Sequence, residues 1–170
     1  MPMRKTMNRS NSGFARNTAL AILAATAASS FCWQAHAEAT RVTFPKLEDL
    51  VHYTTVRRGN VTEHISTTKQ AIDAIQKGQP VPNGTHFVLA DYRDEKIYRY
   101  FVMEKGPGWG ADFEERRRTG DWQFQWYWPD RKINVQENTA RCMSCHSSQK
   151  GADYLFTARR IPEFRGKPVE

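Results

Sequence analysis

The sequence predicts an α+β fold, mainly an antiparallel β-sheet with a few packed helices. Two hairpin patterns and one strand of alternating aromatic residues predict the sheet. Residues 50–57 are rich in β-branched and aromatic types, and Gly59-Asn60 then turns the chain into a second strand over residues 61–65. This pair of strands forms the first expected hairpin.

A short helix and a second hairpin come next. Thr67 and Gln70 make a capping-box pattern before an apolar stretch, and Gly78 with Pro80 ends the helix. Asn83-Gly84 opens a hairpin whose arms are residues 85–92 and 96–104.

An aromatic strand over residues 121–128 follows a glycine-rich loop. Its aromatic side chains recur at every second position, which places Trp122, Phe124, Trp126 and Trp128 on one face. Packing in the core and a wall for a flat cofactor both explain this face. A last helix, capped by Asn138 or Thr139, runs to about Gln149 and ends at Gly151.

The first 37 of the 170 residues have the composition of a secretory signal. They hold four basic residues and no acid, an apolar stretch over residues 18–31, and Ala35-His36-Ala37 before the expected cleavage site. Roughly 14 apolar residues are fewer than the ~20 that span a bilayer, so we expect no stable membrane insertion of the mature chain. The sequence therefore predicts one exported domain, residues 38–170, which is periplasmic in a Gram-negative cell.

The charge of the expected mature chain is nearly balanced. The whole sequence has 25 basic and 18 acidic residues, and removing the four bases of the signal leaves 21 against 18. A small net charge of this size does not indicate a nucleic-acid partner.

The chemistry of the chain is concentrated in Cys142-Met143-Ser144-Cys145-His146. In an exported protein, a Cys-x-x-Cys-His motif is the attachment signature of one haem c. Cysteines three apart on a helix point the same way and reach one porphyrin edge, while His146 offers its imidazole to the iron. A disulfide would leave His146 unexplained, a redox dithiol needs a thioredoxin-like setting, and a structural zinc site needs a fourth ligand.

The second axial position of the iron is expected to be open. Electron-carrier cytochromes c usually fill it with a methionine, but Met143 lies between the cysteines and Met103 would have to leave a predicted strand. Three histidines remain in the mature chain as candidates, and each lies in a strand with polar neighbours: His52, His64 and His86.

The sequence resembles the cytochrome P-460 family and its relatives, the beta-sheet cytochromes c-prime. The resemblance rests on the run from Asn138 to His146 with residues 153–157, on Thr119-Gly120-Asp121-Trp122, and on Asn83-Gly84-Thr85. It implies a mostly β, homodimeric, exported mono-haem protein. Carried over to this chain, Cys142 and Cys145 would hold the porphyrin and His146 would be the proximal ligand.

The resemblance also separates two kinds of chemistry. Family members that oxidise hydroxylamine have a lysine joined to the porphyrin, and the matching position here is Leu89. Lys96 and Lys105 are the nearest other lysines. Phe87 shares a strand face with Leu89, so these two residues, together with Trp126, are the candidates for the distal pocket.

These observations predict a mono-haem c-type cytochrome that binds nitric oxide or related small nitrogen-oxide ligands at an open iron position. The alternatives are a hydroxylamine or nitric oxide oxidoreductase and a six-coordinate electron-transfer cytochrome c with an unidentified redox partner. Four arginines are candidates for the haem propionates, although a solvated charge run also explains most of them: Arg116, Arg117, Arg118 and Arg141.

Overall fold

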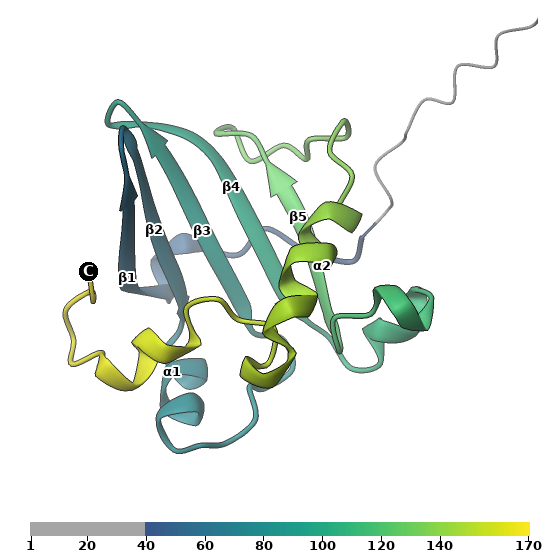
Figure 1. Ribbon diagram of the computed structural model, residues 1–170. Helices are drawn as coiled ribbons and strands as arrows, with labels where there is room; N and C mark the ends of the chain where they lie inside the picture. Colours follow the sequence, from purple (N-terminus) through teal and green to yellow (C-terminus); the bar gives the residue numbers. More distant parts are fainter. Residues whose placement is uncertain (1–39) are drawn as a thin grey trace, which may run out of the picture. The chain divides into compact units, whose positions relative to one another are not determined.

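The computed structural model describes residues 40–170, so the predicted signal sequence and its cleavage site lie outside the described residues. Five strands form one antiparallel sheet in which each strand pairs with the next along the chain (Figure 1). They are β1 (Leu50–Arg58), β2 (Val61–Thr68), β3 (His86–Arg93), β4 (Lys96–Lys105) and β5 (Trp122–Tyr127). The predicted α+β class and both predicted hairpins are confirmed. Within residues 40–170, no helix is long and apolar enough to cross a membrane.

Local turn chemistry fixes the register of the two hairpins. Gly59 turns β1 into β2 with a φ of 59°, a value that glycine adopts without steric cost. Asp94 and Glu95 both have positive φ between β3 and β4, as a two-residue type I′ turn requires. The resulting register aligns Leu89 with Ile65 on one side and with Phe101 on the other.

The first helix, α1 (Lys69–Gln76), begins one residue later than the predicted cap implies. The hydroxyl of Thr68, not that of Thr67, accepts the hydrogen bond from the Ala71 amide at 3.2 Å. Thr67 remains in β2, paired with Phe87, and its hydroxyl donates to the His86 carbonyl at 2.7 Å. The strand ladder therefore continues through the position that the capping-box pattern assigned to the cap.

The second helix, α2 (Ala140–His146), carries the cysteine motif and is shorter than predicted. Thr139 is the N-cap residue and makes no side-chain capping bond, whereas the Asn138 side-chain oxygen accepts from the Ala140 amide at 2.9 Å. A 3-10 helix continues over Ser147–Ala152, and its end is not at Gly151 as predicted but at Asp153, which is left-handed. Tyr154 is left-handed as well, with a φ of 63°.

Chain segments cover both faces of the sheet. The C-terminal segment that begins with α2 lies in front of the sheet in Figure 1, and the first described residues run behind it. The front core includes Tyr53, Phe87 and Trp122. Behind the sheet, Val42 and Phe44 pack against residues of β3, β4 and β5.

The aromatic strand β5 is buried on both faces, which the period of two did not predict. All six of its residues are buried. Gln125 accepts a hydrogen bond from the Thr40 hydroxyl at 2.8 Å, and Gln123 accepts one from the Arg41 amide at 2.9 Å. The stretch behind the sheet thus provides partners for the polar face of this strand.

Single residues also pair with the two outer strands. Val169 forms a parallel bridge with Thr54 of β1, with backbone hydrogen bonds of 3.0 and 2.9 Å to Thr55 and Tyr53. Ile133 forms an antiparallel bridge with Tyr127 of β5.

Candidate haem-binding site

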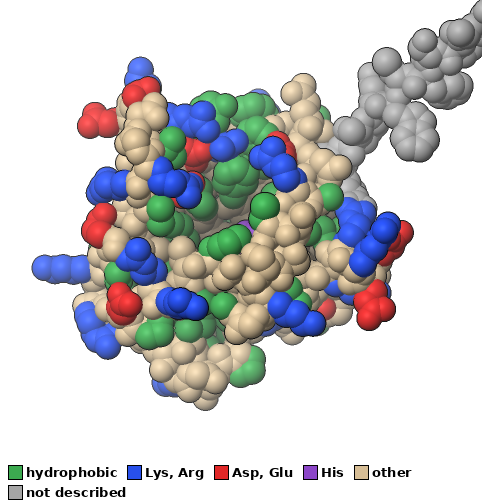
Figure 2. Space-filling view, viewed as in Figure 1, with side chains coloured by type: hydrophobic (Ala, Val, Ile, Leu, Met, Phe, Trp, Pro, Cys, Tyr) green, Lys and Arg blue, Asp and Glu red, His purple; other side chains and the backbone are tan. Residues whose placement is uncertain are grey.

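A cavity of about 530 Å³ lies between the front face of the sheet and α2. It brings together Cys142, Cys145 and His146 from α2 with Phe87 and Leu89 from β3. Figure 2 shows a hollow in this face of the molecule with hydrophobic side chains inside it and basic side chains around its rim. We call this space the haem cavity. Its size lies within the ~300–1,000 Å³ of ordinary ligand and cofactor pockets.

His146 ends α2, and its imidazole is held from three sides. Nδ1 lies 2.6 Å from the Tyr154 carbonyl oxygen. The Phe124 and Phe156 rings lie 4.7 and 4.9 Å from the imidazole, between centroids. Burial lowers the pKa of His146 and so favours the neutral ring. Because a carbonyl can only accept, Nδ1 carries the proton, and the lone pair of Nε2 is left for a metal.

The two cysteines lie one helical turn apart and both line the haem cavity. Both thiols are free, and Cys145 is exposed. Burial is the main cause that raises the pKa of Cys142 to about 11. Among the described residues, no group of three or more His, Cys, Asp or Glu side chains is arranged to hold a metal ion. A zinc site built on these cysteines would therefore lack ligands in this part of the chain.

The sheet supplies an apolar wall to the haem cavity. Phe87 and Leu89 line it together with Phe101 and Ile65 from the neighbouring strands. Phe87 is held edge-on against Tyr53 and Trp122, with ring centroids 6.1 and 5.8 Å away.

Trp126, the third predicted distal residue, is not among the residues that line the haem cavity. Its ring lies beside the lining residue Phe101, with centroids 6.0 Å apart. The guanidinium of Arg99 lies 5.0 Å from the Trp126 ring. The alternation of β5 predicted its face correctly, but not its distance from the cavity along the strand.

Two charged residues of the haem cavity were missed by the sequence analysis. Arg58 and Glu63 both line it, and Arg58 Nη2 donates to Glu63 Oε1 at 2.5 Å. Burial raises the pKa of Glu63, and the positive charge of Arg58 opposes that shift. The cavity that contains the predicted distal residues Phe87 and Leu89 therefore also has a charged end. Arg58 lies two residues after Val56, and Glu63 lies two residues before Ile65, so each shares a strand face with an apolar residue of the cavity. This spacing was the signal in the sequence that could have identified them.

Met103 also lines the haem cavity, from within β4. Met103 faces the cavity from its place in the strand, on the face that it shares with Phe101. The candidate histidines lie elsewhere: His52 stacks on His64 at 4.6 Å, and His86 lies 3.0 Å from Glu104. Of the histidines within residues 40–170, His146 alone lines this space.

Of the remaining candidate cations, some line the haem cavity and others do not. Arg141 lines the haem cavity and lies 3.5 Å from Glu137. The run from Arg116 to Arg118 is not among the lining residues, and Arg116 pairs with Glu114 at 2.9 Å. Lys96 begins β4 at the hairpin turn, and Lys105, at the other end of that strand, pairs with Asp153 at 2.9 Å. Neither lysine lines the haem cavity.

A comparison with known families accounts for this arrangement. The family model described as Cytochrome P460 matches residues 44–157, which include the whole sheet and α2. The chain belongs to the cytochrome P460 family. It is thus a haem-binding cytochrome. A comparison with curated proteins gave no match.

The residues of this cytochrome P460 member fit a haem. The cavity combines an apolar wall for the porphyrin with a neutral imidazole whose Nε2 is available, and with two free thiols on one side. Arg58 and Arg141 are the lining cations available for propionates, which are anionic.

Proposed function

We propose that the chain is an exported mono-haem c-type cytochrome with an open distal iron position, which binds nitric oxide or a related small nitrogen-oxide ligand. One observation carries the proposal. A single cavity joins both cysteines and His146 to an apolar wall of Phe87, Leu89 and Phe101.

In this proposal, Cys142 and Cys145 hold the porphyrin through two thioether bonds, and His146 Nε2 is the proximal ligand. The bound haem would supply an iron with one free axial position for a diatomic ligand. The protein's part is to keep the imidazole neutral and oriented, through the hydrogen bond from Nδ1 to the Tyr154 carbonyl.

The apolar wall favours nitric oxide over ligands that need a hydrogen-bond donor. Nitric oxide forms a strong bond to ferrous iron without such a donor, whereas bound dioxygen is stabilised by one. Arg58 and Arg141 are the cationic donors among the lining residues, and each lies beside an acid, Glu63 and Glu137. The Phe87 ring restricts the space to small ligands.

The oxidoreductase alternative would need the reacting group that distinguishes hydroxylamine-oxidising relatives. Leu89 stands at the position where those relatives have their cross-linked lysine, and neither Lys96 nor Lys105 lines the haem cavity. Both observations favour ligand binding over hydroxylamine oxidation.

The electron-transfer alternative is supported by the position of Met103. Met103 lines the haem cavity, and a methionine sulfur is a common sixth ligand in cytochromes c. This second candidate predicts a low-spin, six-coordinate haem whose partner is another redox protein.

Export and assembly belong to the same proposal. Cleavage between Ala37 and Glu38 would release residues 38–170 into the periplasm, where two copies would form a homodimer and exchange electrons with a separate redox protein. N-terminal sequencing of the exported protein tests the cleavage site, and sedimentation tests the dimer.

Optical spectra of the oxidised, reduced and NO-exposed protein test the proposed ligand chemistry. A five-coordinate, high-spin spectrum that changes on addition of NO is the expected result. A low-spin spectrum that persists under NO in both redox states would overturn it. If Met103→Leu then made the spectrum high-spin, the electron-transfer candidate would be the correct one.

A further inference from the structure

The loop after α2 fixes the orientation of His146 through a backbone atom. The acceptor of the His146 Nδ1 proton is the carbonyl of Tyr154, eight residues further along the chain. Asp153 and Tyr154 present that carbonyl with two consecutive left-handed conformations, at φ 49° and 63°. Left-handed backbone is unfavourable for residues with a side chain, so surrounding contacts must hold it.

The carboxylate of Asp153 provides such contacts. Its Oδ2 accepts from Lys105 Nζ at 2.9 Å, and its Oδ1 accepts from Trp122 Nε1 at 3.2 Å. Both partners are well anchored, since Trp122 is fully buried and the Lys105 side chain is only 16% exposed. The Lys105 ammonium also lies 5.4 Å from the centre of the Trp122 ring. Two strands of the sheet, β4 and β5, thus hold one loop residue.

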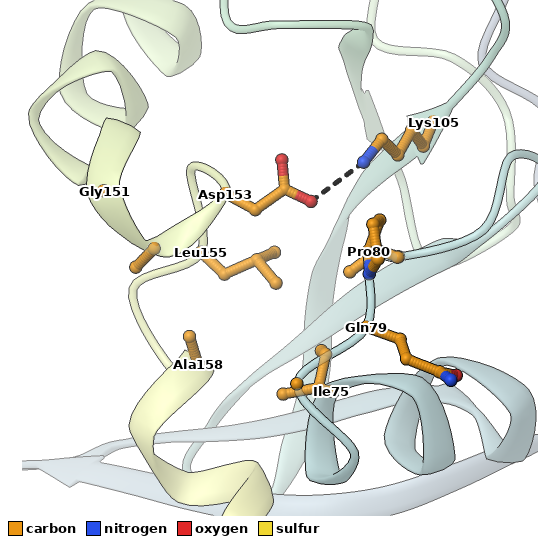
Figure 3. Close-up of a pocket in the computed structure, with 11 residues that line it drawn as sticks. Ile75, Gln79, Pro80, Lys105, Gly151, Asp153, Leu155 and Ala158 are labelled. Carbon is orange, nitrogen blue, oxygen red and sulfur yellow. Dashed lines mark hydrogen bonds and ion pairs between the residues drawn. The ribbon is translucent and has the colours of Figure 1, made fainter.

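Packing alone does not hold Asp153. A second cavity of about 440 Å³ lies beside it, lined by Ile75, Pro80 and Leu155 among others. In Figure 3, Asp153 and Lys105 point toward each other beside this space, from the loop after α2 and from β4. Because the carboxylate has space on that side, its polar contacts are what fix its position.

Tyr154, the residue after Asp153, is also held in place, because its ring packs against Gly120. Gly120 lies so close to this ring that an added Cβ would be 2.9 Å from Tyr154 Cε2. The Tyr154 amide also donates to the Gln149 carbonyl at 2.8 Å. The carbonyl that holds His146 is therefore fixed by contacts on both loop residues.

We propose that the Lys105–Asp153 ion pair is a positioning device for the proximal histidine, which sets the strength of the iron–histidine bond. It acts through the loop backbone, without touching the haem cavity. This inference rests on the proposed function, in which His146 is the iron ligand. A firm hydrogen bond at Nδ1 makes an imidazole a stronger donor to a metal at Nε2.

The test compares holoprotein variants that break the ion pair from either side. Asp153→Asn keeps an acceptor for Trp122 and tolerates the left-handed backbone, and Lys105→Gln removes the cation. Asp73→Asn is the matched control, because it breaks an exposed ion pair of 2.8 Å with Lys69 in α1, away from the loop. The measurements are the iron–histidine stretching frequency of the reduced protein, the reduction potential, and the rate at which NO detaches His146.

We expect both loop variants to lower the stretching frequency and raise the reduction potential relative to wild type. They should also speed the detachment of His146 by on the order of tenfold. The double variant should change these three quantities no more than either single variant does, because the two substitutions remove the same interaction. Asp73→Asn should match wild type in all three measurements.

Unchanged values in both loop variants would overturn the inference and leave the proposed function standing. If Asp153→Asn fails to fold, Lys105→Gln decides the question alone. Wild-type protein without haem, or without an iron–histidine band, would overturn the proposed function and this inference together.

Discussion

The guanidinium of Arg58 and the carboxylate of Glu63 lie 2.5 Å apart, across the β1–β2 hairpin on the wall of the haem cavity. The two side chains are unequally exposed, at 66% for Arg58 and 12% for Glu63. The more buried partner is therefore the acid, and burial raises its pKa even beside the arginine.

This pair predicts a pH-dependent stability. Burial makes the pKa of Glu63 higher in the folded than in the unfolded protein. Glu63 therefore contributes its full stabilisation when the pH is below its pKa in the unfolded protein, and this stabilisation is lost as the pH rises through its pKa in the folded protein. Arg58→Met should raise this pKa further and destabilise the protein at neutral pH by about 0.5–1 kcal/mol, a value reduced by the exposure of Arg58. At about pH 4 the effect should shrink. Urea unfolding at both pH values measures it.

Glu63→Gln supplies the control for that experiment. Adding Arg58→Met to this variant should cost less at neutral pH than Arg58→Met costs in wild type, because no buried carboxylate is left unpaired. An equal cost in both backgrounds would show that the two side chains are not coupled.

Covalent attachment of haem is the second prediction. Extraction with acidified acetone should leave the colour on the protein, and the intact mass should exceed that of the polypeptide by one haem. Cys142→Ser and Cys145→Ser should each leave at most one thioether bond. Haem that extracts freely from wild type, or attachment unaffected by Cys142→Ser, would rule out the proposed role of the motif.

The third prediction is that no lysine is bonded to the porphyrin. Leu89 occupies the matching position, Lys105 is engaged by Asp153, and Lys96 lies at the hairpin turn. Peptide mapping of the digested holoprotein should give a haem peptide from residues around the cysteine motif only. A second fragment containing Lys96 or Lys105 would instead support hydroxylamine oxidation.

The fourth prediction concerns ligand discrimination by Phe87. Phe87→Ala should raise carbon monoxide affinity more than NO affinity, by on the order of tenfold or about 1.4 kcal/mol. Carbon monoxide forms a weaker bond to the iron than NO does, so steric contact with the Phe87 ring has a larger effect on its affinity. Ligand titrations of the reduced protein measure both affinities.

Phe113→Ala controls for the loss of core packing in that experiment. Phe113 is buried to a similar extent, at 7% against 4% exposed, but does not line the haem cavity. Both variants should lose about 3–5 kcal/mol of stability. Equal changes in the ratio of the two affinities would mean that Phe87 acts through the core alone.

The strands and hairpins could be predicted because their turns are encoded locally. Gly59-Asn60 marks the turn of the first hairpin, Asn83-Gly84 marks the start of the second, and alternation marks the faces. The cap of α1 could not be assigned between Thr67 and Thr68, because the ladder of β2 with β3 decides where the strand ends. Long-range pairing overrides the local pattern there.

Part of the site could also be predicted from local sequence, and part could not. The spacing of Cys142, Cys145 and His146 identifies the ligand helix from local sequence alone. The charged end of the cavity depends on which face of the sheet α2 covers, a long-range contact that the local pattern around Arg58 and Glu63 does not encode. Asp153 and Tyr154 are left-handed although neither is glycine, so the sequence gives no local sign of this conformation. The contact of the Tyr154 carbonyl with His146 could therefore not be predicted either.

The isolated bridges at Val169 and Ile133 also bear on how copies of the chain can associate. An outer strand with unpaired backbone groups is a template for another strand, and proteins that remain soluble block it. Val169 occupies the backbone of β1 at Tyr53 and Thr55, and Ile133 pairs at Tyr127 of β5. A dimer that extended the sheet across either side would first have to displace these residues. Loss of the last few residues would instead leave β1 open and favour aggregation.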